Sequence, residues 1–290
     1  MRKTRVELNC LLEKEAAMWK QRSQVDWFRE GDRNTRFFHA KASSRFKKIL
    51  IEGILDSNDV WQEEEAEIDK VFVEYYSELF SSANPIDFDE ILEVVQPKVS
   101  RHMNEQLIKE FQPSEVFQAL KQIYHLKGPG PDGMPPLFYQ HFWPTMGNVV
   151  TKTVLDFLNF GVIPHNFNET QIVLIPNVNR PQRVTEYRLI SLCNMVYKMA
   201  TKTLANRLKK ILPAIINDTQ SAFVNDKLIT DNILVAFETM HHIGQRKTGQ
   251  KGEMALKLDM SKIYDRVEWV CLDRIMEKLG FHPRWRNLMM

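Results

Sequence analysis

Residues 127–136 form the segment that most restricts how this chain can fold. Three glycines and four prolines fall within these ten residues: Gly128, Gly130, Gly133, Pro129, Pro131, Pro135 and Pro136. Proline fixes φ and removes a backbone N–H, so neither a helix nor a central strand is expected to continue through this segment. A phosphate-cradling loop needs donated backbone N–H groups, which prolines lack. We therefore expect a rigid loop that does not bind phosphate.

On both sides of this loop, apolar residues recur every three or four positions, which is the period of an amphipathic helix. On the helix expected at 195–212, Ala200 and Leu204 should face the core, whereas Lys202 and Arg207 should face solvent. The pattern as a whole predicts helices over residues 6–29, 62–80, 87–95, 104–111, 195–212 and 266–279, one beginning at Ser114, one beginning at Asp231 and one ending at Gly161.

Three segments have the pattern of β-structure instead. Residues 171–176 and 187–192 are short apolar runs on either side of a loop that contains Arg180 and Arg183. This arrangement predicts a β-hairpin with a positively charged tip, in which residues 171–176 form a buried strand. Apolar residues 49–55, followed by a turn at 56–59, indicate another strand or hairpin. Residues 254–259 alternate apolar and polar side chains, which predicts a strand with Asp259 near its end, facing away from the core.

The charge is uneven along the chain. Residues 1–50 carry 13 Lys and Arg against 6 Asp and Glu, residues 51–100 carry 2 against 14, and the whole chain has a formal charge of +2. Aromatic residues are interleaved with the cations of the first block, a composition typical of surfaces that bind single-stranded nucleic acid. An amphipathic helix with solvated cations would also explain that block. The candidate nucleic-acid contacts are Lys20, Arg22, Arg29, Arg33, Arg36, Lys41, Lys47, Lys48, Arg180 and Arg183.

Several classes of protein are not expected. No run approaches the ~20 apolar residues of a membrane span, and the basic residues after Met1 are not followed by the apolar region of a signal peptide. The cysteines Cys10, Cys193 and Cys271 are far apart and form no CxxC motif, which argues against a disulfide framework or a zinc site. We expect a soluble intracellular protein with no membrane partner and no evident targeting signal.

Four stretches of the chain resemble motifs of reverse transcriptases. Residues 258–266 (LDMSKIYDR) resemble the first catalytic motif, and residues 187–194 (YRLISLCN) resemble the fingers motif. Residues 220–224 (QSAFV) with 229–233 (ITDNI) are similar to the block that follows it. Residues 127–133 (KGPGPDG) resemble the loop upstream of the fingers in non-LTR retrotransposon polymerases. The resemblance covers nearly the whole chain and is to LINE-type elements, most of all those of plants.

This resemblance implies an α+β fold, with the fingers and a partial palm of a right-hand polymerase and a mostly helical N-terminal extension. Residues 1–100 would be that extension, which resembles the connector between endonuclease and polymerase in such elements. Residues 101–170 would be a helical lead-in containing the Gly/Pro loop. Residues 171–290 would be the fingers and the first part of the palm, truncated before the Asp-Asp motif of the family.

The resemblance also assigns roles to four residues. Asp259 would be the catalytic carboxylate and a Mg²⁺ ligand, because this hard cation prefers carboxylate oxygens. Arg188 would hold the triphosphate of the incoming nucleotide, and Tyr264 would lie under its sugar. Lys227 stands where the family usually has an arginine on the triphosphate side. The implied partners are an RNA template, a DNA primer and dNTPs.

The chain departs from the family pattern in ways that bear on activity. It contains no Asp-Asp pair, so these 290 residues lack the remaining metal-binding carboxylates of the family. Asn177, Leu189 and Ile263 stand where the family usually has Lys, Pro and Ala. Because one carboxylate cannot hold two Mg²⁺ ions in catalytic geometry, we expect these residues to be inactive alone.

The interpretation that follows is a fragment of the RNA-directed DNA polymerase of a non-LTR retrotransposon, acting in the nucleus or cytoplasm. Two alternatives stay open. One is a non-catalytic nucleic-acid-binding remnant of a decayed element, and the other is a relic without function. The oligomeric state is not indicated. An open edge on the Asp259 strand, with an apolar face behind it, predicts low solubility.

Overall fold

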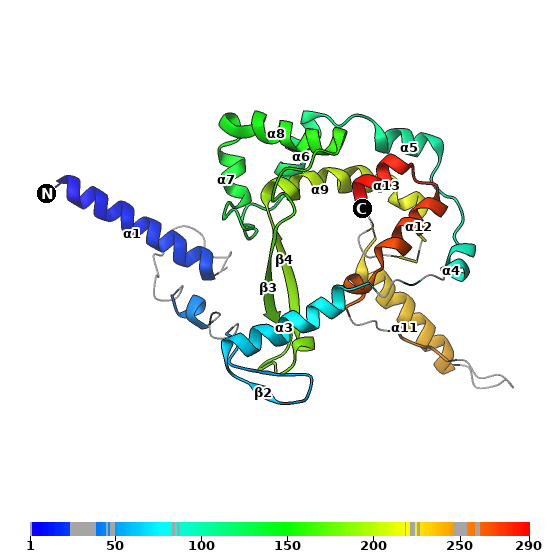
Figure 1. Cartoon of the computed structure of the whole chain (residues 1–290), viewed down its shortest axis with the longest axis horizontal. Coiled ribbons are helices and arrows are strands. Elements are labelled where there is room, and N and C mark those ends of the chain that lie inside the picture. The colour runs from blue at the N-terminus through cyan, green and yellow to red at the C-terminus, as the bar shows by residue number, and fades with distance from the viewer. Residues whose placement is uncertain are drawn as a thin grey trace. The chain divides into compact units, whose positions relative to one another are not determined.

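Figure 1 shows the structure of the chain, which is a computed structural model. It describes residues 2–23, 39–44, 46, 50–82, 85, 88–217, 219–220, 224, 227–245, 254–258 and 262–290. The chain divides into two compact units. The first contains Met1–Glu78, His125–Pro135 and Glu169–Cys193, and the second contains Leu79–Tyr124, Pro136–Asn168 and Asn194–Met290. Both units are therefore built from segments that are far apart in sequence.

In the first unit, a small hairpin forms where the apolar run and turn predicted one. Strand β1 (Ile54–Leu55) pairs antiparallel with β2 (Trp61–Gln62). The Asp56 carboxylate closes the turn by accepting the backbone N–H groups of Asn58 at 2.8 Å and Val60 at 2.9 Å. These bonds, that from Val60 above all, hold the pKa of Asp56 below its usual value because they stabilise the ionised carboxylate.

The larger hairpin confirms the strands predicted on either side of the basic loop. Strands β3 (Thr170–Pro176) and β4 (Tyr187–Cys193) pair antiparallel, with Thr170 opposite Cys193 and Pro176 opposite Tyr187. The expectation that β3 is buried is wrong, since its residues are exposed or half-buried. A sheet of only two strands leaves part of its surface open to water, so the apolar run alone overstated the burial.

Helix α3 (Glu65–Phe80) supplies apolar cover for this hairpin. Its Ile68, Phe72 and Tyr76 are buried, on the stripe that the helical period predicted. The ring of Phe72 meets the buried ring of Tyr187 edge to face, with centroids 5.3 Å apart. The first unit also contains α1 (Arg2–Ser23), whose described apolar side chains are exposed, Val6 and Leu11 among them.

The second unit is helical in its described residues. Its helices are α4 (Asp89–Glu93), α5 (Arg101–Ile108), α6 (Pro113–Gln122), α7 (Pro136–His141), α8 (Trp143–Phe160), α9 (Met195–Leu208), α10 (Leu212–Ile215), α11 (Ile229–Gln245), α12 (Trp269–Leu279) and α13 (Pro283–Met289). Gly161 and Gly280 adopt left-handed conformations, with φ of 73° and 92°, and end α8 and α12 as glycine allows. Both helix ends agree with the sequence prediction.

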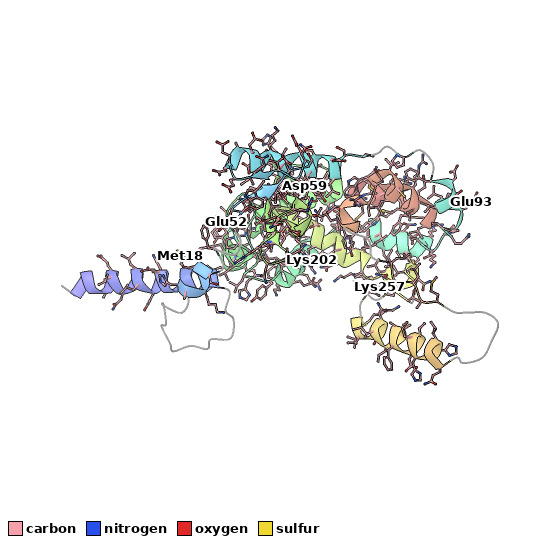
Figure 2. All side chains as sticks on the ribbon, turned by 90° about the horizontal axis from the view of Figure 1, so that it is seen from below. Met18, Glu52, Asp59, Glu93, Lys202 and Lys257 are labelled. Carbon is pink, nitrogen blue, oxygen red and sulfur yellow. The ribbon has the colours of Figure 1, made fainter. Side chains whose placement is uncertain are left out.

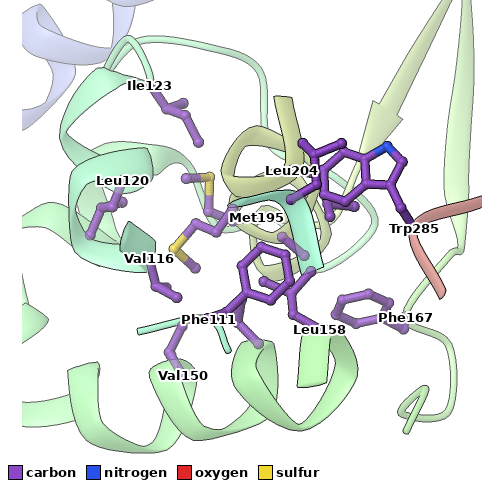
Figure 3. Packing of buried hydrophobic residues seen from close by; sticks show 14 of the residues in the cluster. Phe111, Val116, Leu120, Ile123, Val150, Leu158, Phe167, Met195, Leu204 and Trp285 are labelled. Carbon is purple, nitrogen blue, oxygen red and sulfur yellow. The ribbon is translucent and has the colours of Figure 1, made fainter. Parts of the chain in front are cut away.

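One apolar core holds this unit together. Buried side chains from α5, α6, α8, α9, α12 and α13 form a single cluster, which includes Leu120, Leu158, Met199 and Trp285. Figure 3 shows Phe111, Leu204 and Trp285 in this packing. The core therefore joins residues near position 107 to residues near the end of the described chain.

Arg207 lies inside this unit, so the prediction that it faces solvent is wrong. Arg207 is only 6% exposed. The guanidinium donates to both carboxylate oxygens of Glu115, at 2.8 Å each, and to the backbone carbonyls of Leu107, Lys109 and Glu110. All five N–H groups of the guanidinium are thus paired, which makes burial of this charge tolerable.

Helix α13 was not expected from the sequence, and it is fastened by polar contacts. Arg286 donates to both carboxylate oxygens of Asp273 on α12, at 2.8 Å each. The His282 ring nitrogen Nδ1 accepts the backbone N–H of Arg284 and so caps the start of α13. The Asn104 side chain bridges this joint to α5, because it donates to the carbonyl of Gly280 at 2.7 Å and accepts the N–H of His282 at 2.8 Å.

The segment before Asp259 does not form the predicted strand over its described residues, 254–258. Among the described residues, the strand pairings are β1 with β2 and β3 with β4, so the segment has no paired strand there. Its apolar side chains are strongly exposed, as is the apolar face of α11, for example Leu258 at 79% and Phe237 at 65%. None of the helices in the described part of the chain is long and apolar enough to cross a membrane.

Candidate functional site

The loop between β3 and β4 is held in a defined shape by hydrogen bonds among its own residues. The N–H of Asn177 donates to the carbonyl of Glu186 at 2.8 Å. The Glu186 carboxylate accepts the N–H groups of Gln182 at 2.6 Å and Arg183 at 3.2 Å. These bonds, that from Gln182 first, keep the pKa of Glu186 below its usual value. The basic tip predicted from the sequence is therefore an ordered loop, in which Arg180 has a left-handed backbone with φ of 55°.

Two contacts join this loop to the small hairpin of the same unit. The N–H of Leu55 donates to the carbonyl of Gln182 at 2.8 Å. Arg183 pairs with Asp59 at 2.7 Å. Since both of these side chains are more than half exposed, this ion pair contributes little to stability. The pair offsets part of the charge of Arg183, and both Arg180 and Arg183 are exposed on the loop.

A hollow of about 1200 Å³ opens between the loop and the small hairpin. Its lining combines one cation, Arg180, and one carboxylate, Glu52, with the amides of Asn177 and Asn179 and the indole of Trp61. The Trp61 ring lies against Gly53, where a Cβ atom would come within 2.4 Å of it, so a larger residue there would displace the indole. A cation, amides and an aromatic ring are groups that contact phosphates and bases of a single strand, although Glu52 offsets the charge of Arg180 here.

Arg188 lies on the face of β4 opposite to Tyr187, because successive strand residues point to opposite faces. Tyr187 is buried and contacts α3, which leaves Arg188 exposed beside its cross-strand partner Ile175. An exposed guanidinium on a paired strand is positioned to bind an anionic ligand bidentately. The role of Arg188 toward the triphosphate stays a prediction.

The other predicted nucleotide-binding residues belong to the second unit. Tyr264 is 75% exposed in the short 3₁₀ turn Ile263–Arg266. Lys227 is half-buried just before α11. Asp259 lies outside the described residues. Arg188 is in the first unit, so the joining of these residues into one nucleotide site stays a prediction.

The basic N-terminal block is described only in part. Lys41 is exposed in a helical segment at residues 39–44. Lys20 and Arg22 belong to α1, but their side chains are not among the described ones. The remaining predicted contacts of this block lie outside the described residues: Arg29, Arg33, Arg36, Lys47 and Lys48.

The described residues do not fit the Mg²⁺ ions that the resemblance implies. Among them, no three His, Cys, Asp or Glu side chains come together in a group that could hold a metal ion. Two-metal chemistry needs carboxylates from more than one position, and Asp259 is outside the described part of the chain. No catalytic step through a metal can therefore be assigned to these residues.

Trp61 and Asn179 were missed as candidate site residues. Neither stands in a local motif, and they reach the hollow only because the small hairpin docks on the β3–β4 loop. The available signal was Gly53 beside an apolar run, since an isolated glycine there marks a close approach.

Comparison with known proteins adds two findings. Residues 175–290 match the family described as reverse transcriptase (RNA-dependent DNA polymerase). The chain is also 28% identical, over 266 residues, to the "Transposon TX1 uncharacterized 149 kDa protein" of Xenopus laevis. That alignment covers 91% of this chain and 20% of the relative, so the chain spans about a fifth of the length of that protein.

Proposed function

We propose that this chain is part of the reverse transcriptase of a non-LTR retrotransposon, and that its 290 residues bind an RNA template and do not synthesise DNA alone. The observation that carries the proposal is the ordered basic hairpin loop, with Arg180, Arg183 and the exposed Arg188, near the start of the family match. The hollow beside the loop adds Trp61 as a stacking surface.

The finer assignments are part of the same proposal. The β3–β4 hairpin would belong to the fingers and Asp259 to the palm, with Arg188, Lys227 and Tyr264 on the side of the incoming dNTP. A DNA primer would be the second nucleic-acid partner, and the protein would act in the nucleus or cytoplasm. The plant-like affiliation and the domain limits at residues 100 and 170 stay predictions.

Reversing three cations of the N-terminal block is expected to weaken RNA binding about ten-fold or more. The variant Arg33→Glu/Arg36→Glu/Lys41→Glu removes three phosphate contacts, and each contact to a single strand contributes about 0.7 to the slope of log K against log salt. The slope should therefore become shallower by about 2. Fluorescence anisotropy with a labelled uridylate oligomer of about 20 nucleotides measures both quantities.

A matched control makes the same total change in charge outside the N-terminal block. Lys70, Lys152 and Lys278 are exposed on α3, α8 and α12, and their joint reversal to glutamate should change affinity less than about two-fold. Equal losses in the two triple variants, or binding by the wild type that is indifferent to salt, would contradict RNA binding through this block.

In a primer-extension assay, these 290 residues are expected to incorporate no dNTP above background with Mg²⁺ present. The family generally uses divalent metal ions, yet the sequence contains no Asp-Asp pair to complete a two-metal site with Asp259. Asp259→Ala should therefore leave the result unchanged. An active reverse transcriptase on the same primer and template verifies the assay. Incorporation that requires Mg²⁺ and disappears in Asp259→Ala would show that the residues are active alone.

A further inference from the structure

A second polar hollow lies in the second unit, between α6 and α9, and no motif of the sequence pointed to it. Its volume is about 440 Å³. Helix α6 contributes Glu115, Gln118 and Gln122, and α9 with the turn after it contributes Lys202, Asn206, Arg207, Lys209 and Lys210. Figure 2 marks Lys202 on α9. We propose that this α6–α9 pocket binds the phosphate backbone of single-stranded RNA.

The charge of the pocket is strongly positive. Four cations face one carboxylate among its lining residues, and that carboxylate, Glu115, is held by both branches of the Arg207 guanidinium. Because the Arg207–Glu115 pair is neutral as a unit, the net positive charge of the lining equals that of its three lysines. Helix α9 has no acidic residue along its whole length. Such a concentration of positive charge attracts a polyanion.

The spacing of the lining residues suits an extended chain of phosphates. Gln118 and Gln122 are four positions apart on α6, as are Lys202 and Asn206 on α9, and residues at this spacing lie on one face of a helix. Two rows of donors, amides on one side and ammonium groups mostly on the other, therefore border the pocket. Amide N–H groups donate to phosphate oxygens, and lysines neutralise phosphate charge.

The pocket is held on a rigid base. Arg207 fastens α9 to Glu115 of α6 and to the carbonyls of Leu107 and Glu110 that precede it. Its guanidinium also lies over the Phe111 ring, 3.5 Å from the ring centre. Since the two helices cannot separate without breaking these bonds, the donors keep their spacing, and binding costs less ordering entropy.

The identity of the polyanion as RNA rests on the proposed function, whereas the site itself rests on residues that the proposed function does not use. The N-terminal block and the hairpin loop belong to the first unit and the α6–α9 pocket to the second. RNA binding through the first unit alone and RNA binding through both units therefore predict different results for the same set of variants.

The test is the affinity of the full chain for the uridylate oligomer in about 50 to 200 mM salt, with and without pocket substitutions. Lys202→Gln/Lys209→Gln/Lys210→Gln should bind about ten-fold more weakly, with a salt slope shallower by about 2. The matched control, Lys70→Gln/Lys152→Gln/Lys278→Gln, has the same charge change and should lose less than about two-fold. Replacing the three pocket lysines with arginine should keep the affinity.

A second variant tests the pocket independently, in case the triple lysine variant does not fold. Gln118→Glu/Gln122→Glu leaves every lysine in place and adds two negative charges to exposed positions of α6. It should also weaken binding about ten-fold. For both variants, the circular dichroism spectrum and the unfolding midpoint should match those of the wild type.

The outcomes separate the two proposals. If the pocket and control triples lose affinity equally while the wild type binds RNA in a salt-dependent way, the pocket proposal fails and the proposed function stands. If the wild type does not bind RNA, both fail. If inorganic phosphate displaces the oligomer as well as unlabelled oligomer does at equal phosphate concentration, the pocket is a small-anion site and the RNA proposal is overturned.

Discussion

Replacing Arg207 with methionine is expected to lower the free energy of unfolding of the second unit by about 3–5 kcal/mol. The substitution keeps much of the apolar volume that covers Phe111, but it removes every donor that the guanidinium provides. The Glu115 carboxylate, about a quarter exposed, would lose its charged partner. The carbonyls of Leu107 and Glu110 would lose theirs as well. A partly buried charge left without its partner is costly, and this cost dominates the expected loss.

An exposed ion pair of the same unit provides the matched control. Arg101 pairs with Glu105 at 3.0 Å on α5, with both side chains largely exposed, and Arg101→Met should cost less than about 1 kcal/mol. Urea denaturation followed by tryptophan fluorescence measures both variants. Equal losses in Arg207→Met and Arg101→Met would contradict the assigned importance of the buried pair.

The pH dependence of stability gives an independent check on the same pair. Burial alone would raise the pKa of Glu115, but the bonds from Arg207 and the Gln112 N–H and the nearby charges outweigh it, so the pKa lies below its usual value of 4.5. A lowered pKa contributes stability above about pH 4.5 that is lost as the pH falls through the folded-state pKa. The stability difference between wild type and Arg207→Met should therefore shrink below that pH.

Replacing Trp285 with alanine should be comparably severe, at about 3–5 kcal/mol. Trp285 is among the largest fully buried side chains of the described chain, and its removal would leave a cavity between α13 and the core. Trp285→Phe should cost much less, because among the described residues the indole N–H has no hydrogen-bond partner, and phenylalanine removes that unpaired donor.

A tryptophan on the surface of the neighbouring helix is the control for this series. Trp269 on α12 is 67% exposed, and Trp269→Ala should change the free energy of unfolding by less than about 0.5 kcal/mol. In urea denaturation, the free energy of unfolding of Trp285→Ala should be well below that of Trp285→Phe. That of Trp269→Ala should be close to the wild-type value. A loss below about 1 kcal/mol in Trp285→Ala would show that α13 does not complete the core.

Features governed by neighbouring residues could be predicted from the sequence. The hairpin β3–β4 followed from two apolar runs around a polar loop, and the buried stripe of α3 followed from the helical period. The ends of α8 and α12 at Gly161 and Gly280 followed from the tolerance of glycine for positive φ. In each case, the residues that decide the structure lie within one continuous segment of the chain, at most 23 positions apart in the hairpin.

Features that depend on distant partners could not be predicted. The outward assignment of Arg207 failed because its partners lie 92 to 100 positions away in sequence. The strand before Asp259 failed because alternation predicts which face a side chain takes but does not supply a paired strand. Helix α13 depends on Asn104 and Asp273, and a seven-residue helix has little periodic signal of its own.

For the candidate site, local motifs located Arg188 on a paired strand and Arg180 at a loop tip. They did not reveal Trp61 beside that loop or the amides of the α6–α9 pocket, because docking of distant segments creates both surfaces. The predicted role of Asp259 stays a prediction, since that residue lies outside the described part of the chain.

Because the core joins early and late segments of the chain, it cannot be completed until the late segments have been synthesised. Phe111 and Leu120 belong to the same cluster as Trp285, yet the ribosome makes Trp285 last among them. At about 5–20 residues per second, the stretch from Ile211 to Trp285 takes roughly 4–15 s to translate. Throughout that interval the nascent chain carries an uncovered apolar surface, which is what chaperones bind. Folding of the second unit is therefore tied to the synthesis of α13, the helix that carries Trp285.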